Sequence, residues 1–293
     1  LHSPPAAMAV ACGSAHTLAL AERGCRVFAC GSGNDGQLGA GTREHQRAPA
    51  PVAGLEGLPD IVMVAAGNEH SAAITSAGRL LLWGRNDSGQ LGQGDREDRL
   101  VPVTLGPPQF GGAPVAMVAC GGIHTLVVTR AGLLFAFGNG REGQLGLGDR
   151  NHRDVPAEVG PGRFGGAIIA YAAAGELHSG VVTVDGAVWT WGCGRWGRLG
   201  HNGEQDELVP RELEGQFGGA RALSLAAGYA HTMVLTTCGA VWGCGQGDYG
   251  QLGVGDTADR HAPVRVGGEE AFGQSRVRMV ACGFHHTVAV TEE

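Results

Sequence analysis

The sequence has few charged residues and no long apolar stretch. Charged residues make up 17% of the chain and hydrophobic residues 43%, a composition typical of a folded protein rather than a disordered one. No run of about 18 apolar residues is present, so we expect no membrane-spanning helix. Neither end carries a run of basic residues, and the net charge is −7. Both features argue against nucleic acid as a direct partner.

Metal-binding and secretion signals are also missing. The eight cysteines include no CxxC pair, the spacing common in zinc and redox sites. Most of them stand where other parts of the sequence have Ala or an aromatic residue, so we expect reduced and buried thiols. The opening residues lack the charged and long apolar regions of a signal peptide. We therefore expect an intracellular protein, cytoplasmic or nuclear, with no metal, no cofactor and no membrane contact.

Glycine is abundant, at 53 residues, and much of it belongs to two repeated motifs. The segment WGCGRWGRLG at residues 191–200 has four variants elsewhere, and the glycines at its second position are 53 or 54 residues apart. A second motif, G-x-x-H-[TS], occurs six times at spacings of 53 to 55 residues, beginning at Gly13, Gly67, Gly121, Gly175, Gly228 and Gly283. Self-similarity at a fixed period of this size predicts a repeat architecture.

Each period holds about four strand-sized pieces. Short runs rich in Val, Ala and Thr flank the G-x-x-H-[TS] motif, and these predict two strands buried on both faces. A third run with alternating large residues leads into the WGxG segment, and a proline in the fourth run predicts an edge strand or a connector. Four-stranded sheets repeated along a chain predict an all-β protein of the β-propeller class. No helical periodicity appears, which excludes a solenoid of helix pairs.

The two motifs together resemble the repeat of the regulator of chromosome condensation family (RCC1-like repeats). Six copies of one motif and five of the other cover the whole chain. The resemblance implies a propeller of four-stranded blades, usually seven in this family, and the shorter count here fits a piece of a longer chain as well as a short propeller. We assign one domain, 1–293, with five complete repeats and a sixth split between the termini: 13–66, 67–120, 121–174, 175–227, 228–282, and 283–293 with 1–12.

One histidine per repeat forms what we call the histidine series. Because these residues recur once per blade, they cannot converge on one metal ion, and we interpret them as structural. We expect each to hydrogen-bond backbone within its own blade, and we expect Trp83 and Trp191 to fill the core. The histidine series consists of His16, His70, His124, His178, His231 and His286. No combination of residues fits a catalytic site, so we predict no catalytic residue and no enzyme activity.

Residues that vary between repeats, where the repeat itself does not fix them, are the candidates for partner binding. They lie between the Gly and His of one motif and in the loop after the aromatic-Gly of the other. By the resemblance, both loops open on the face where family members contact partners; the alternative is a merely solvated rim. We expect Arg195, Trp196, Tyr229, Asp248 and Tyr249 to form one patch. The full candidate set is Glu69, Arg85, Asp87, Arg141, Glu142, Glu176, Arg195, Trp196, Tyr229, Asp248, Tyr249 and Phe284.

These features favour a non-catalytic protein-interaction scaffold or regulatory propeller, alone or as one domain of a larger protein. The resemblance offers two alternatives: a guanine-nucleotide exchange factor for a small, Ran-like GTPase, and the partner-recognition propeller of a ubiquitin ligase. The uniform repeat length leaves no room for the β-wedge of the founding exchange factors. A light sensor like the plant ultraviolet-B photoreceptor is disfavoured because no residue pair between Gly and His contains Trp. We expect a protein partner, with a small GTPase as one candidate.

Overall fold

The computed structural model describes residues 7–21, 26–213, 217–267, 272 and 275–292. The chain divides into two compact units. The first comprises residues 1–131, 135–139 and 152–158, and the second comprises residues 132–134, 140–151 and 159–293. No helix among the described residues is long and apolar enough to cross a membrane.

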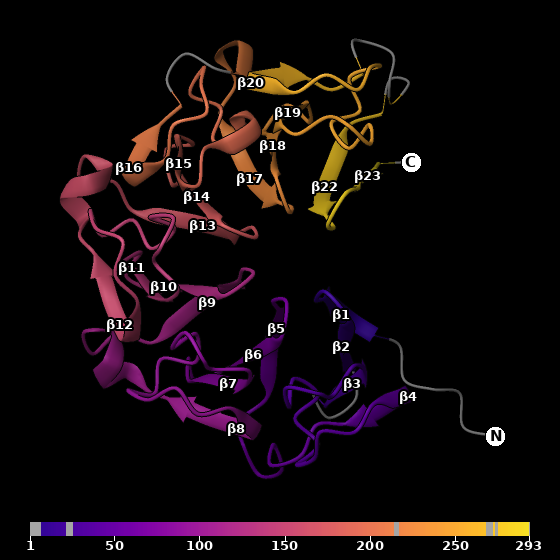
Figure 1. Ribbon diagram of the computed structural model, residues 1–293, viewed down its shortest axis with the longest axis vertical. Coiled ribbons are helices and arrows are strands. Elements are labelled where there is room, and N and C mark those ends of the chain that lie inside the picture. Colours follow the sequence, from indigo (N-terminus) through magenta and orange to yellow (C-terminus); the bar gives the residue numbers. More distant parts are fainter. Residues whose placement is uncertain (1–6, 22–25, 214–216, 268–271, 273–274, 293) are drawn as a thin grey trace. The chain divides into compact units, whose positions relative to one another are not determined.

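The first unit is built from three four-stranded antiparallel sheets in chain order (Figure 1). Their first strands, β1, β5 and β9, lie next to one another in succession. The strands are β1 (Ala7–Cys12), β2 (His16–Ala21), β3 (Val27–Gly31), β4 (Gln46–Pro51), β5 (Ile61–Ala66), β6 (His70–Thr75), β7 (Leu80–Gly84), β8 (Arg99–Leu105), β9 (Val115–Cys120), β10 (His124–Thr129), β11 (Leu134–Gly138) and β12 (Arg153–Val159), with the 3-10 turn η1 (Pro107–Phe110).

The second unit repeats this plan with two four-stranded sheets and one two-stranded sheet. Here the first strands β13, β17 and β22 are neighbours. The elements are β13 (Ile169–Ala174), β14 (His178–Thr183), β15 (Val188–Gly192), β16 (Glu207–Glu212), β17 (Ala222–Ala227), β18 (His231–Thr236), β19 (Val241–Gly245), β20 (Arg260–Arg265), β22 (Val277–Cys282) and β23 (Thr287–Thr291), with the 3-10 turns η2 (Pro161–Phe164), η3 (Arg195–Gly197) and η4 (Phe217–Gly219).

Sheet boundaries differ from our repeat boundaries by one strand. Residues 7–12, which we assigned to a split repeat with 283–293, form β1 and pair with β2. The reason is that G-x-x-H-[TS] is the turn of a hairpin: the Gly13 N–H donates to the His16 carbonyl oxygen at 2.9 Å. A division at the glycine therefore separates two paired strands. The all-β fold of four-stranded sheets is as predicted, and the single 1–293 domain stays a prediction.

Burial follows the order of strands within each sheet. The second strands β6, β10, β14 and β18 are buried at every position, as the apolar runs predicted. The first strands are buried on one face only, and Val62 on β5 is 55% exposed, so the prediction of two buried faces is wrong for them. The prolines fall on outer edge strands, as predicted, because a proline cannot donate to a sheet ladder. They are Pro49, Pro102, Pro156, Pro210 and Pro263.

Large side chains pack between neighbouring sheets. Trp83 and Trp191 are fully buried, and each indole N–H donates to a glutamine carbonyl oxygen, of Gln37 at 2.8 Å and Gln144 at 2.9 Å respectively. Each tryptophan thus buries a large ring and satisfies its one polar atom. Cysteines are less uniform than expected. Cys193 and Cys244 are buried, Cys30, Cys120 and Cys282 are half-buried, and Cys12 and Cys238 are exposed; Cys25 lies outside the described residues.

Four members of the histidine series link one sheet to the next, so the prediction of backbone bonds within a blade is wrong for them: His16, His70, His178 and His231. His16 Nε2 lies 2.8 Å from the Ser71 hydroxyl, which donates to the Gln37 carbonyl oxygen at 2.7 Å. His178 makes the equivalent contact with Thr232 at 2.9 Å. Because the single hydroxyl proton goes to a carbonyl, the hydroxyl accepts from Nε2–H, which fixes the neutral tautomer. The last member, His286, is exposed and departs from this pattern.

Candidate functional site: an aromatic surface on the second unit

Both variable loops of a sheet lie at the same end of it. The turn between the first and second strands is closed by a bond from its glycine, as in Gly228 N–H to the His231 carbonyl at 2.9 Å. The loop after the third strand is bonded to that turn, since Gln246 N–H donates to the Ala230 carbonyl at 2.9 Å. Short hairpins held by such bonds present their side chains on a rigid support.

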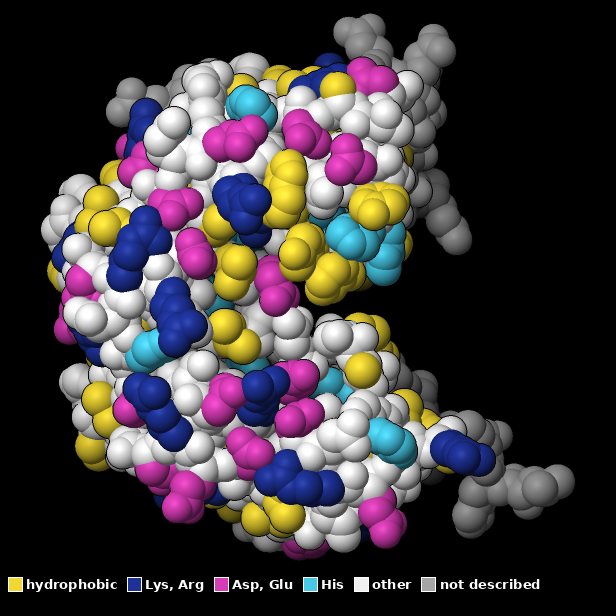
Figure 2. All heavy atoms as spheres, viewed as in Figure 1, with side chains coloured by type: hydrophobic (Ala, Val, Ile, Leu, Met, Phe, Trp, Pro, Cys, Tyr) yellow, Lys and Arg dark blue, Asp and Glu magenta, His cyan; other side chains and the backbone are white. Residues whose placement is uncertain are grey.

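Five side chains from three neighbouring sheets of the second unit form what we call the aromatic surface. Tyr229 is its centre: its ring stacks on Phe284 at 4.2 Å and lies 6.3 Å from Trp196 and 5.4 Å from His285. Tyr249 joins through His285, at 4.5 Å between ring centroids. Contacts at these distances and angles are favourable aromatic pairs. Apolar side chains next to histidines are visible on this face in Figure 2.

The aromatic surface is open to solvent at one end. Tyr249 is 67% exposed and Phe284 45% exposed, whereas Trp196, Tyr229 and His285 are half-buried. Among the described residues, Tyr249 and Phe284 are the aromatic side chains with this degree of exposure. Aromatic area that folding leaves in water is the type of surface that protein partners bury.

Two arginines border Trp196. The Arg195 guanidinium carbon lies 5.1 Å from the indole ring centroid and that of Arg198 lies 4.9 Å from it. Arg195 is exposed, whereas Arg198 is 1% exposed and donates to the Tyr229 carbonyl oxygen at 3.1 Å. Burial lowers the pKa of Arg198 below its usual value, and the guanidinium still remains charged at neutral pH. The turn η3, which carries Trp196, also contacts β19 and β20 of the next sheet.

The structure brings together most of the patch we expected. Arg195, Trp196, Tyr229 and Tyr249 meet, and Phe284 belongs with them. Asp248 is exposed beside Tyr249 and accepts from Gln246 Nε2 at 3.0 Å. Sequence reasoning missed His285 and Arg198. Both carried a usable signal: His285 lies in a variable Gly-to-His pair, and Arg198 stands where four repeats have Gln.

Other predicted candidates of the second unit have structural contacts of their own. Arg141 is exposed, and its carbonyl oxygen accepts from Arg150 Nη1 at 2.7 Å. Glu176 is half-buried, and its backbone N–H donates to the Gly228 carbonyl at 3.2 Å. Glu176 thereby ties two neighbouring G-x-x-H turns together.

The candidates of the first unit bind one another. Arg85 is hydrogen-bonded to the carboxylate of Glu69 and donates from Nε to Asp87 Oδ2 at 2.8 Å. The hydrogen bond to Glu69 raises the pKa of Arg85 above its ordinary value. All three side chains are at least one-third exposed, so the pairs are of modest energy. The charge of Arg85 is therefore already paired within the chain.

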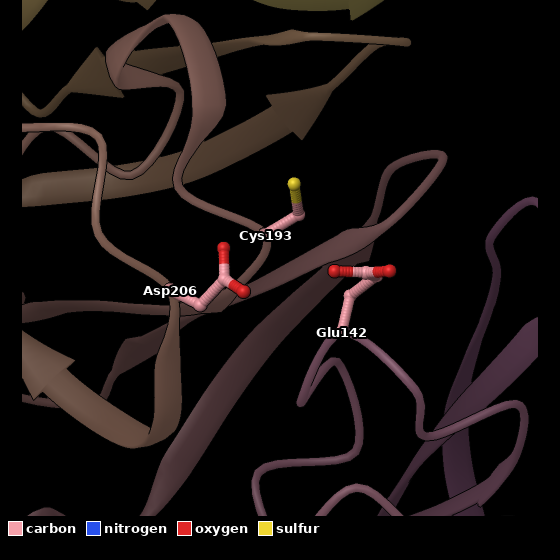
Figure 3. Close-up of side chains that lie close together, drawn as sticks. All are labelled: Glu142, Cys193 and Asp206. Atoms are coloured by element: carbon pink, nitrogen blue, oxygen red, sulfur yellow. The ribbon is translucent and has the colours of Figure 1, made fainter.

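Figure 3 shows Glu142, Cys193 and Asp206 close together, with their ligand-type atoms within 4.8 Å of one another. Arg150 supplies the counter-charge: its Nη2 donates to Asp206 Oδ2 at 2.9 Å, and its Nη1 lies 3.7 Å from Glu142 Oε2. Asp206 also accepts from the Gly194 N–H at 3.0 Å. Burial raises the pKa of Cys193, so this thiol adds no charge beside the two carboxylates. We interpret this cluster as an ion pair that stabilises the loop.

The fold and motifs define a class of protein, and comparison with known families agrees. The sequence matches the RCC1-like domain family over residues 2–293, and the chain belongs to that family. It is therefore an RCC1-like β-propeller of the kind found in regulatory and protein-binding proteins.

Three proteins similar to this chain differ in name and are longer than the segment they share with it. The chain is 40% identical over 285 residues to the ultraviolet-B receptor UVR8 of Arabidopsis thaliana, covering 97% of this chain and 63% of that protein. It is 36% identical over 286 residues to human E3 ubiquitin-protein ligase HERC2, covering 97% of this chain and 6% of that protein. Yeast RCC1 (Prp20), solved bound to Kap60, is 25% identical with a TM-score of 0.81, covering 97% of this chain and 67% of that one. The chain thus spans less than two-thirds of UVR8 and HERC2.

Proposed function

We propose that this chain is a non-catalytic protein-binding propeller that engages its partner through the aromatic surface. The observation that carries the proposal is a continuous series of ring contacts with Tyr249 67% and Phe284 45% exposed; the rings are those of Trp196, Tyr229, Phe284, His285 and Tyr249. Tyr and Trp are the residue types that contribute most binding energy at interfaces. Rings that are already stacked lose little side-chain entropy when a partner covers them.

The remaining titratable groups support a binding role over catalysis. Five histidines of the series are buried, all but His286, and burial lowers the pKa of His70 to about 3 and that of His16 to about 4. A general base at neutral pH needs access to substrate and a pKa near 7. Burial raises the pKa of Cys244 to about 12, which leaves that thiol protonated and unreactive.

The relatives suggest two partner classes for this surface. A Caenorhabditis elegans relative that is 33% identical over 260 residues is named an X-linked retinitis pigmentosa GTPase regulator homolog, and HERC2 is a ubiquitin ligase of which the matching part is 6%. A small GTPase and a ligase substrate are therefore the two partners to look for first. Light sensing is not proposed, because the Gly-to-His pairs contain no tryptophan.

The test compares capture of partners by three forms of the chain. One is wild type, one is Tyr249→Ala/Phe284→Ala, and the control is Val184→Ala/Leu223→Ala, which removes exposed apolar side chains away from the aromatic surface. We expect a protein that wild type and control retain and the aromatic variant loses. A small GTPase in that set would be followed by nucleotide-release kinetics. Identical partner sets for all three forms would contradict the proposal.

A further inference from the structure

The loop that carries Trp196 lacks a glutamine that its four counterparts share. In the other repeats, a glutamine side-chain oxygen accepts the backbone N–H of the residue two positions earlier, at 2.9 Å in each case. These pairs are Asp35 with Gln37, Ser88 with Gln90, Glu142 with Gln144, and Tyr249 with Gln251. Arg198 occupies the glutamine position in the fourth copy, and a guanidinium cannot accept a hydrogen bond.

Loss of that bond accompanies a different backbone. Trp196 has φ 60°, in the left-handed region, whereas none of its four counterparts has a positive φ. A bulky side chain in this region is strained unless its surroundings hold it there. The position of Trp196 therefore needs a specific support, and Arg198 is the adjacent group with the contacts to provide it.

Arg198 connects the loops of two neighbouring sheets. Its Nε donates to the Arg195 carbonyl oxygen and its Nη1 to the Tyr229 carbonyl oxygen, each at 3.1 Å. Its guanidinium carbon lies 4.9 Å from the Trp196 ring and 6.0 Å from the Tyr229 ring. Its charge is stabilised by the Arg195 and Tyr229 carbonyl oxygens, by the faces of the Trp196 and Tyr229 rings, and by the charge of Glu176.

We propose that Arg198 is a positioning residue that sets the orientation of Trp196 and Tyr229, and that it makes this one loop, of five, the base of a binding surface. The positioning role is independent of any partner, while its consequence for binding rests on the proposed function. Glutamine at this position would restore the loop seen in the other four copies and release both rings.

The test uses Arg198→Gln in protein labelled with 5-fluorotryptophan, read by ¹⁹F NMR. The five tryptophans give separate signals, and Trp196→Phe assigns the one of interest. We expect the Trp196 signal to shift and become more solvent-exposed, with the other four signals and the melting temperature near those of wild type. The control is Arg221→Gln, which loses an arginine bonded to the Val184 carbonyl at 2.9 Å elsewhere in the unit. It should leave the Trp196 signal in place.

Binding of the partner recovered with the wild-type chain gives the second readout. We expect Arg198→Gln to weaken it about tenfold or more, since Trp196 and Tyr229 would no longer be held in one orientation before the partner binds. A shifted Trp196 signal with unchanged binding would support the positioning role and count against the proposed function. An unshifted Trp196 signal would overturn the positioning role, whatever the binding. If the glutamine variant fails to fold, the same two measurements are made on Arg198→Lys. Lysine keeps the positive charge but lacks the planar guanidinium that bonds both carbonyl oxygens.

Discussion

His70 Nε2 on β6 lies 3.0 Å from the hydroxyl oxygen of Thr125 on β10, which belongs to the next sheet of the first unit. Thr125 in turn donates to the carbonyl oxygen of Gln90 at 2.8 Å. Both side chains are fully buried. One hydroxyl therefore satisfies polar groups from two places in the preceding repeat, which explains why the motif pairs His with Thr or Ser.

Removal of this hydroxyl should be costly. Thr125→Val leaves a buried imidazole N–H and a carbonyl without their partner, so we expect the free energy of unfolding to fall by about 2–4 kcal/mol. Thr104→Val makes the same change on the edge strand β8, at an exposed position, and should stay within about 0.5 kcal/mol of wild type. Urea denaturation measures both. Equal stability of the two variants would argue against the linking role.

The neutral histidines predict a pH dependence of stability. Burial lowers the pKa of His70 to about 3 and that of His231 to about 4, against about 6.5 in an unfolded chain. Because the folded pKa values are depressed, the unfolded state takes up protons first, and stability present above about pH 6.5 is lost as pH falls. The melting temperature should fall between about pH 6.5 and 4, and less steeply in His70→Gln. A flat profile from pH 7 to 5 would contradict this.

Two glycines separate the effect of close packing from that of backbone conformation. Gly84 and Gly57 both have positive φ, of 102° and 76°. A Cβ on Gly84 would lie 2.5 Å from the Glu69 carbonyl oxygen, whereas one on Gly57 would meet nothing within 4 Å. We expect Gly57→Ala to cost about 1 kcal/mol, from the backbone alone, and Gly84→Ala to cost more than about 3 kcal/mol. Equal losses in thermal unfolding would show that the contact at Gly84 is unimportant.

Thiol chemistry should distinguish two cysteines of the second unit. Cys238 is exposed, and its hydrogen bond with the Thr236 hydroxyl lowers its pKa, whereas burial raises the pKa of Cys244 to about 12. Iodoacetamide at neutral pH should modify Cys238 in the folded protein and Cys244 only after denaturation. Peptide mass spectrometry reads both sites in one sample. Early modification of Cys244 would mean that its sheet opens readily.

The repeat pattern was sufficient to predict four-stranded sheets, edge prolines and buried tryptophans, because each of these follows from local sequence at a fixed period. Contacts between repeats were harder to predict. The sequence shows that His16 recurs, but only the packing of one sheet on the next brings it to Ser71. The repeat boundaries were placed one strand away from the sheet boundaries for a similar reason, since the recurring glycine lies in a hairpin turn and not between sheets.

The candidate surface was predicted in part. Variable Tyr, Trp and Arg residues pointed to the loops that carry the aromatic surface, yet composition could not separate Arg85, which is paired with Glu69 and Asp87, from Arg195, which lies over Trp196. Arg198 was overlooked because, from the sequence alone, one arginine in place of a repeated glutamine looks like a substitution without structural effect. Its role depends on distances to Trp196 and Tyr229 that only the folded chain provides.

Site-specific photocrosslinking tests the protein-binding role of the aromatic surface most directly. Benzoylphenylalanine would replace Tyr249, the most exposed ring of the surface, or Leu223, an exposed apolar residue on β17 outside it. Tyr249 tolerates replacement because exposed positions change stability by about 0.5 kcal/mol or less. The account predicts a discrete protein adduct from position 249, absent from position 223 and suppressed by excess wild-type chain. Adducts from both positions alike, or from neither, would contradict it.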